Sequence, residues 1–183
     1  DNLYVGGTFT TISLSTRNYI ASYNLNTRLL NSWNPNANNY VWEILPWGSK
    51  VYLGGDFTTV NGQARNRVAA IDANTGIPTA WVSGANNDVR ALAMFHDKLI
   101  VGGDFTNYNI QARNGLAEVD TVTGNTGSWD PDYGASSAVY EVKAYGNELF
   151  VGGNMYSIEG QLRQCFAVYL NCATPAPAGN TTQ

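Results

Sequence analysis

Four short stretches of the chain consist of three apolar residues, and two glycines follow each stretch. These stretches are Leu3–Val5, Val51–Leu53, Leu99–Val101 and Leu149–Val151. A short apolar run that ends at turn residues is typical of a β-strand. We expect the glycines to break the strand, at a point that needs unusual torsion angles or a close neighbour. The aromatic residue that follows, such as Phe57, is expected to pack against the next repeat.

The spacing of these stretches defines an internal repeat. The second glycine stands at positions 7, 55, 103 and 153, so the period is 48, 48 and 50 residues. Arginine recurs with the same spacing at 17, 65, 113 and 163, and tryptophan recurs at 33, 81 and 129. A fixed period of this length indicates a repeat architecture.

Each repeat contains four segments with strand character, separated by turn residues such as Asn61-Gly62. In the second repeat the expected strands are Val41–Leu45, Lys50–Leu53, Arg67–Ile71 and Thr79–Trp81. Four antiparallel strands in about 45–50 residues are typical of one blade of a β-propeller. The sequence therefore predicts an all-β fold, a β-propeller arc of about four 48-residue, four-stranded blades. Because propellers close with about 4–8 blades, we expect the arc to be part of a larger ring.

The expected domain organisation is a propeller segment over residues 1–172 and a linker over residues 173–183. The linker is rich in Pro, Thr and Ala and leads to a following module. Charged residues make up only 13% of the chain, and the ten Lys and Arg residues are scattered singly. A nucleic-acid surface would need a basic stripe, so nucleic acid is not an expected partner. No apolar run approaches the roughly 20 residues of a membrane helix.

Two residue types repeat at positions where they are expected to serve the blade. The aspartates are Asp56 and Asp104, and the arginines include Arg65 and Arg113. The aspartate is expected to anchor the turn after the glycines, and the arginine to pair with it or with backbone carbonyls. A residue repeated at one place in successive blades usually stabilises the shared interface.

The candidate ligand-binding residues lie on the first strand of each repeat, which is expected to line the channel. They are Trp42, Arg90 and Tyr140, where aromatic and charged side chains could form a platform. Glu43 and Glu141 follow two of them, and paired carboxylates could serve glycoside hydrolysis. The alternative is that these side chains pack between blades.

The chain offers little else with catalytic or metal-binding chemistry. Asp130 and Asp132 could share a calcium ion, but the matching Asn34-Pro35-Asn36 favours a turn fixed by proline. The single histidine, His96, stands where other repeats have a hairpin glycine, and no motif pairs it with a nucleophile. We therefore expect no metal and no cofactor. Cys165 and Cys172 form either a disulfide, if the protein is secreted, or two buried thiols.

The segment from Tyr52 to Asp72, with Thr75-Gly76, Trp81 and the run Trp33–Asn38, resembles a family of secreted bacterial β-propeller repeats of unknown function. These repeats are related to the delta-sixty repeats. The fourth repeat departs from the pattern at Asn154-Met155-Tyr156 and at Gln164. The tail from Cys172 to Gln183 resembles junctions before immunoglobulin-like modules in large surface proteins of gliding Bacteroidota, exported by the type nine secretion system.

The resemblance implies an extracellular or cell-surface location and no known reaction. The implied partners are other modules of the same large chain, the type nine export machinery and surface glycans. Asp120-Thr121-Val122 resembles the sequon at which Bacteroidota attach O-glycans to exported proteins, so Thr121 is a candidate glycosylation site.

The main functional hypothesis is a non-enzymatic, adhesin-like binding or scaffold module, because every repeated residue has a structural role. Two alternatives stay open, both with a site at the channel mouth. One is a polysaccharide-active enzyme, and the other is a carbohydrate-binding lectin that uses Trp42 and Tyr140.

Overall fold

The computed structural model describes residues 1–134, 137–155, 157–158, 161–162, 165–170 and 174–175, and these residues contain strands and turns but no helix. These residues therefore include no helix that is long and apolar enough to cross a membrane. The longer strands form four antiparallel sheets. Sheet 1 contains β1 (Asn2–Gly6) and β4 (Ile20–Asn24); sheet 2 contains β5 (Val41–Trp47), β6 (Lys50–Gly55) and β9 (Val68–Asp72); sheet 3 contains β10 (Val89–Phe95), β11 (Lys98–Gly103) and β14 (Leu116–Asp120); sheet 4 contains β15 (Ala138–Tyr145), β16 (Glu148–Asn154), β19 (Phe166–Leu170) and β20 (Thr174–Pro175).

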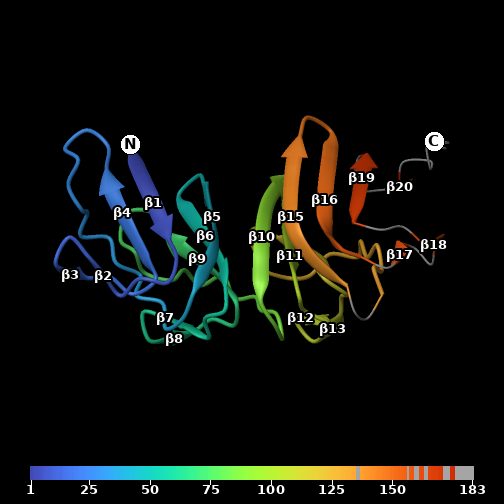
Figure 1. The fold of residues 1–183 in the computed structure, drawn as a ribbon, viewed down its shortest axis with the longest axis horizontal. Helices are drawn as coiled ribbons and strands as arrows, with labels where there is room; N and C mark the ends of the chain where they lie inside the picture. Colours follow the sequence, from blue (N-terminus) through green and yellow to red (C-terminus); the bar gives the residue numbers. More distant parts are fainter. Residues whose placement is uncertain (135–136, 156, 159–160, 163–164, 171–173, 176–183) are drawn as a thin grey trace.

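A short hairpin follows the second long strand of every repeat, where the sequence indicated only a turn. The hairpins are β2 (Thr11–Ile12) with β3 (Ser15–Thr16), β7 (Thr59–Val60) with β8 (Gln63–Ala64), β12 (Asn107–Tyr108) with β13 (Gln111–Ala112), and β17 (Ser157–Ile158) with β18 (Gln161–Leu162). The four sheets lie side by side in chain order, and the hairpins lie together at one end of them (Figure 1).

Two expectations about the strands were wrong. The expected outer strand Thr79–Trp81 is reduced to a single bridge between Ile71 and Pro78, as it is at Tyr23 with Leu30 and at Val119 with Thr126. The strands also continue through the glycines, because β6 ends at Gly55 and β11 at Gly103. In sheet 4, Thr174 and Pro175, which belong to the expected linker, pair with β19.

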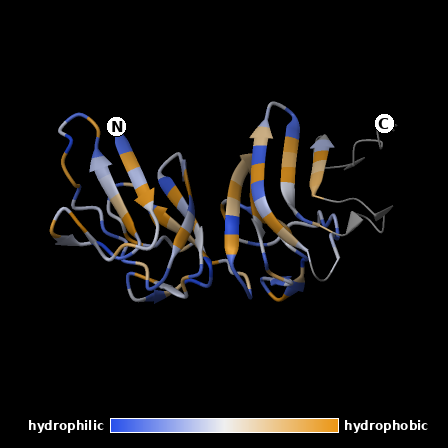
Figure 2. Cartoon of the chain, in the orientation of Figure 1, coloured by the Kyte–Doolittle hydropathy of each residue, from blue (hydrophilic) through white to orange (hydrophobic). Residues whose placement is uncertain are grey.

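Alternation along each strand divides the core between neighbouring sheets. In sheet 2, Val51, Leu53 and Ile71 pack in one cluster with Ile20 of sheet 1. Tyr52, Val68 and Ala70 pack in another cluster with residues of sheet 3 such as Val101. Both faces of a central sheet are therefore apolar. Figure 2 shows hydrophobic and hydrophilic residues in bands along the strands. Each sheet is stable only between neighbours, which explains the low charge content.

The two glycines of each pair allow two close approaches. A Cβ atom on Gly54 would lie 2.7 Å from Val89 of the next sheet, and one on Gly102 would lie 2.6 Å from Val139. A Cβ atom on Gly55 would lie 2.1 Å from the backbone oxygen of Tyr40. The first glycine thus brings neighbouring sheets together, and the second lets the chain cross its own first strand.

The repeated tryptophans connect each repeat to the next. The indole N–H of Trp33 donates to the backbone oxygen of Asp72 at 3.0 Å, and that of Trp81 donates to Asp120 at 3.0 Å. Both rings are buried and meet a tyrosine edge-to-face, Tyr4 and Tyr52 respectively. A buried indole needs such a partner, so the tryptophan fixes the spacing of adjacent sheets.

We predict that Phe57→Ala and Phe105→Ala each lower the free energy of unfolding by about 3–5 kcal/mol, because both rings are fully buried. Val122→Ala is the control, since Val122 is exposed and its truncation should change stability by less than about 0.5 kcal/mol. Urea denaturation monitored by tryptophan fluorescence measures both. A loss below about 1 kcal/mol for the phenylalanine variants would contradict burial between sheets.

Candidate functional site

The first strands of sheets 2, 3 and 4 each carry a bulge at the same place. The pairing register shifts between Val41 and Glu43, between Val89 and Ala91, and between Val139 and Glu141. The extra residues are the three predicted ligand-binding residues, Trp42, Arg90 and Tyr140. A bulge turns its side chain out of the sheet, and these side chains are 43%, 36% and 53% exposed. β10 contacts both β5 and β15, so the three bulges lie on neighbouring strands.

Aromatic side chains gather beside the first bulge. The ring of Tyr40 meets the ring of Trp42 edge-to-face with 5.1 Å between centroids, and it meets Tyr19 at 5.6 Å. Tyr40 and Trp42 are exposed, and Tyr19 is half-buried. Three linked aromatic rings at the surface form an apolar platform with a polar tip on each tyrosine.

Charged side chains of alternating sign gather beside the second bulge. Asp56 forms an ion pair with Arg67, and Asp88 lies 3.9 Å from Arg67 and 3.7 Å from Arg90. Arg90 is also 2.6 Å from Asp104 and contacts it through Nε and Nη2. We call the aromatic and charged side chains together the entry cluster, and its members are Tyr19, Tyr40, Trp42, Asp56, Arg67, Asp88, Arg90, Asp104 and Tyr140.

The two halves of the entry cluster adjoin, and the guanidinium of Arg90 extends it to sheet 4. The backbone N–H of Asp56 donates to the backbone oxygen of Tyr40 at 2.9 Å. The guanidinium of Arg90 lies over the ring of Tyr140 at 5.8 Å from the centroid, a cation–π distance. The entry cluster therefore runs across all four sheets at the ends of the first strands.

The ion pairs affect the ionisation of the cluster. Burial raises the pKa of Asp88, and a hydrogen bond with Asp56 raises it further. The hydrogen bond from Arg90 to Asp104 raises the pKa of Arg90, so this arginine stays charged. Three carboxylates therefore share two guanidinium groups, and the raised pKa of Asp88 favours its protonated form.

The backbone shows strain at two residues of the entry cluster. Tyr19 and Arg67 occupy the same repeat position and have φ values of 64° and 68°. Gly115 fills this position in the third repeat, with φ of 76°. The left-handed region suits glycine and is unfavourable for a bulky side chain, so both residues hold a conformation that costs about 1–2 kcal/mol. Cys165 holds this position in the fourth repeat with φ of 75°, and the backbone of this position is hydrogen-bonded in successive repeats, so the left-handed conformation belongs to the repeat fold.

The repeated arginines have a different environment. Arg65 donates to the backbone oxygens of Ala64 and Thr79, each at 2.7 Å. Arg113 donates in the same way to Ala112 and Gly127, and it also pairs with Asp130 at 3.1 Å. These arginines therefore fix the segment that follows the third strand and forms the single bridge to it. The repeated aspartates do not contact them, because Asp56 pairs with Arg67 and Asp104 with Arg90.

The other carboxylates considered from sequence contact side chains of the protein. Asp132 accepts a hydrogen bond from Asn114 at 3.1 Å, and Asp130 pairs with Arg113. Among the described residues, no group of three or more His, Cys, Asp or Glu side chains could hold a metal ion. Glu141 pairs with Lys143 at 3.0 Å, and burial raises the pKa of Glu43.

The remaining predicted sites lie away from the entry cluster. Thr121 is half-buried, and its hydroxyl donates to the backbone oxygen of Asp97 at 3.1 Å. His96 is exposed in the β10–β11 turn with φ of 52°, where Gly48 and Gly146 have 58°. Cys165 is exposed, and Cys172 lies outside the described residues, so their pairing stays a prediction.

Sequence reasoning missed Tyr19, Tyr40, Arg67 and Asp88. A signal was available, because these residues stand at repeat positions where the residue type changes between repeats. Tyr19 aligns with Arg67, and Tyr40 aligns with Asp88. Where the residue type differs between repeats, beside positions where it stays the same, the side chain is not required by the repeated fold.

Comparison with known proteins supports the fold and leaves the function open. A family model described as a domain of unknown function (DUF5122) β-propeller matches residues 49–74 and 97–125. These two repeats are similar to a β-propeller family of unknown function. Both matches span the second strand, the hairpin and the third strand of a repeat. A search of curated proteins finds no match.

Two computationally designed proteins have a similar structure. The crystal structure of the Ika4 protein matches with a TM-score of 0.56 and 18% identity, over 82% of this chain and 78% of that one. The crystal structure of the Ika8 protein matches with a TM-score of 0.53 and 17% identity, over 84% of this chain and 40% of that one. At this identity the likeness concerns the fold alone.

We predict that Arg65→Ala lowers stability more than Arg90→Ala. Arg65 is 8% exposed and holds two backbone oxygens, so its loss should cost about 2–3 kcal/mol. Arg90 belongs to a partly exposed ion pair, so its loss should cost less than about 1 kcal/mol. Chemical denaturation of the two variants measures the difference. Equal losses would contradict the division between structural and surface arginines.

Proposed function

We propose that this chain is a non-enzymatic binding module of a secreted, adhesin-like cell-surface protein, and that the entry cluster binds a glycan. The observation that supports this most is the size of the side chains of Tyr19 and Arg67. A position that takes glycine in the third repeat holds a large side chain in the first two. The left-handed backbone itself serves the fold, since Tyr19 bonds to Phe9 and Arg67 to Phe57 through the backbone, but the fold needs no large side chain there. The side chains are therefore best explained by the surface that they create.

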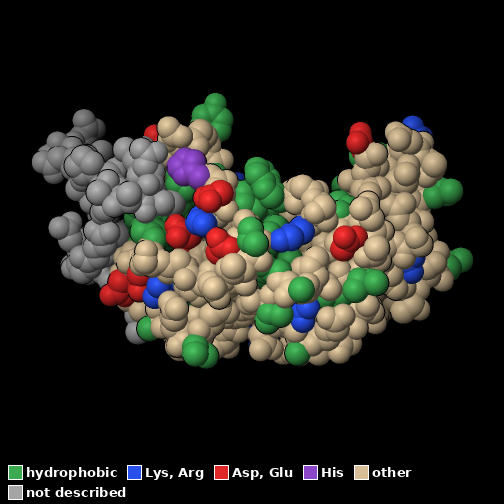
Figure 3. Space-filling view, turned by 180° about the vertical axis from the view of Figure 1, so that it is seen from behind, with side chains coloured by type: hydrophobic (Ala, Val, Ile, Leu, Met, Phe, Trp, Pro, Cys, Tyr) green, Lys and Arg blue, Asp and Glu red, His purple; other side chains and the backbone are tan. Residues whose placement is uncertain are grey.

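The chemistry of the entry cluster suits a sugar chain. The C–H face of a sugar ring can lie against Trp42 and Tyr40, and its hydroxyls can donate to carboxylates and accept from guanidinium groups. Arg67 and Arg90 are already positioned by their aspartates, so little ordering entropy is lost on binding. On the face seen from behind the view of Figure 1, acidic and basic side chains lie close together in small groups (Figure 3).

We also propose that the four sheets are an arc of a larger propeller ring. Sheet 4 leaves Phe166 exposed, and sheet 1 leaves Leu3 exposed. The equivalent positions in the central sheets, Leu116 and Val51 respectively, are buried by a neighbour. Electron microscopy of the complete protein should show a closed ring of blades, and an open stack of sheets would contradict this proposal.

A glycan array probed with this chain, followed by calorimetry of the strongest hit, tests the binding function. Trp42→Ala should weaken binding at least tenfold, because the ring supplies the stacking surface. Trp47→Ala is the matched control: it lies on the same strand at the other end and is 54% exposed. Equal affinity for both variants, or no binding to any glycan, would contradict the proposal.

An assay for cleavage of the bound polysaccharide separates the binding module from the alternative of a polysaccharide-active enzyme. The raised pKa of Asp88 is the observation that favours a general acid, since catalytic carboxyls are often shifted in this direction. Release of new reducing ends from a bound polysaccharide, abolished by Asp88→Asn, would favour the enzyme. An unchanged ligand after prolonged incubation would favour the binding module.

A further inference from the structure

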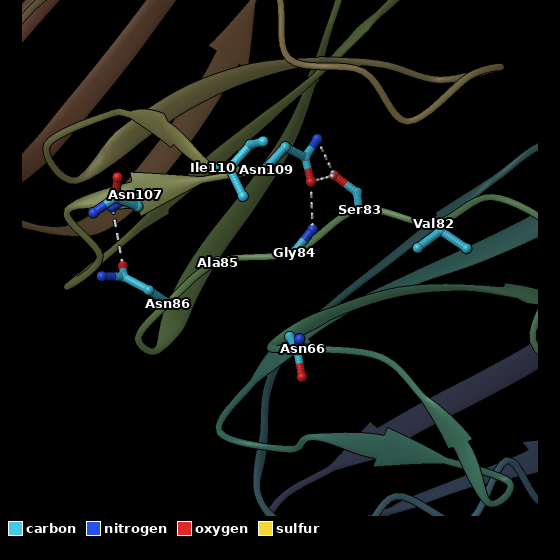
Figure 4. Close-up of a pocket in the computed structure, with 9 residues that line it drawn as sticks. All are labelled: Asn66, Val82, Ser83, Gly84, Ala85, Asn86, Asn107, Asn109 and Ile110. Carbon is cyan, nitrogen blue, oxygen red and sulfur yellow. Dashed lines mark hydrogen bonds between the residues drawn. The ribbon is translucent and has the colours of Figure 1, made fainter.

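A pocket lies between sheets 2 and 3, near the short hairpins. It has a volume of about 580 Å³, within the usual range of small-molecule sites. Asn66 borders it from sheet 2, and Val82, Gly84, Asn107 and Ile110 border it from the other side (Figure 4). None of these residues belongs to the entry cluster.

One residue that borders the pocket is a glycine where two other repeats have a polar residue. Gly84 stands where the first repeat has Asn36 and the third has Asp132. In those repeats a side-chain bond fills the space: Asn18 donates to Asn36 at 2.6 Å, and Asn114 donates to Asp132 at 3.1 Å. Asn66 is the equivalent of Asn18 and Asn114, and it faces Gly84, which has no side chain to accept its hydrogen bond.

The far wall of the pocket is held in place by its own hydrogen bonds. The side-chain oxygen of Asn109 accepts from the backbone N–H of Gly84 at 2.9 Å, and its amide donates to the backbone oxygen of Gly124 at 2.8 Å. The Ser83 hydroxyl is buried and lies 2.8 Å from the Tyr108 hydroxyl. The pocket is therefore preorganised, which lowers the cost of binding.

The residues that border the pocket are uncharged. Asn66 and Asn107 are exposed and carry amides that can both donate and accept. Val82 and Ile110 are exposed apolar residues at the rim. A charged ligand would find no counter-ion here, whereas a neutral sugar ring offers hydroxyls to the amides and a C–H face to the apolar rim.

We propose that this pocket binds one neutral sugar unit, either a free monosaccharide or the terminal residue of a glycan. The site is separate from the entry cluster, so it stands whether or not the entry cluster binds a glycan. The side-chain amide of Asn66, which has no side chain at position 84 to bond with, distinguishes this place from the equivalent ones in the first and third repeats. The two residues are themselves in contact, since a Cβ atom on Gly84 would lie 3.2 Å from the Cβ atom and the backbone oxygen of Asn66.

Nitrogen-15 NMR titration of the chain tests the proposal, with glucose, galactose, mannose and N-acetylglucosamine as neutral probes and glucuronic acid and glucosamine as charged ones. At least one neutral sugar should shift the side-chain amide signals of Asn66 and Asn107. The same sugar linked to a longer chain separates a terminal residue from a free monosaccharide. The charged sugars should bind at least tenfold more weakly.

Variants of this pocket and of the entry cluster show whether the sugar binds in the pocket. Gly84→Asn should weaken binding at least tenfold, because its side chain fills the pocket and restores the bond found at Asn36. Asn66→Ala should weaken it as well, whereas Asn18→Ala, the matched control in the first repeat, should not. Trp42→Ala should leave this binding unchanged even if it abolishes binding at the entry cluster.

Thermal denaturation of each variant shows whether it is folded. If Gly84→Asn does not fold, Asn66→Ala tests the pocket in its place. The proposal is overturned if no neutral sugar shifts the amide signals of Asn66 or Asn107, if the charged sugars bind as well as the neutral ones, or if folded Asn66→Ala binds as tightly as the unchanged chain.

Discussion

The structure depends on the close approach between the first glycine of each pair and the valine that begins the next sheet. Gly6 meets Val41, Gly54 meets Val89 and Gly102 meets Val139. Any larger residue would push the sheets apart, and each sheet buries apolar side chains on both faces only while its neighbours stay close. The buried tryptophans add one hydrogen bond per junction at the outer side. Stability is therefore a property of the junctions more than of the separate sheets.

This division leaves other positions free to carry function. The glycines, the repeated arginines and the tryptophans do the same structural work in successive repeats. The bulge residues and the left-handed position beside them also meet across the junctions, but through side chains of different type, since they change from Tyr19 and Trp42 to Arg67 and Arg90. Position 84 varies in the same way at the hairpin end, where glycine replaces the Asn36 and Asp132 of other repeats.

The all-β class and most strand positions could be predicted from the sequence, because the period and the alternation are local signals. Lys50–Leu53 and Leu116–Asp120 were expected and are strands. The outer strand was not predictable from propensity, since Thr79–Trp81 has strand character but its hydrogen bonds end after one bridge. Trp42, Arg90 and Tyr140 were found because they share a repeat position. The chain of ion pairs through Arg67 and Asp88 was missed because it joins residues of different repeats, and no short-range pattern records such a contact.

Glycine-to-alanine substitution at one repeat position tests the central role of the junctions most directly. A Cβ atom on Gly54 or Gly102 would meet the next sheet within 2.7 Å, whereas one on Gly152 would have its nearest described neighbour at 3.9 Å. Chemical denaturation of this chain should show losses of about 1–3 kcal/mol for Gly54→Ala and Gly102→Ala, and little change for Gly152→Ala. Similar losses for all three variants, or none for the first two, would contradict the account.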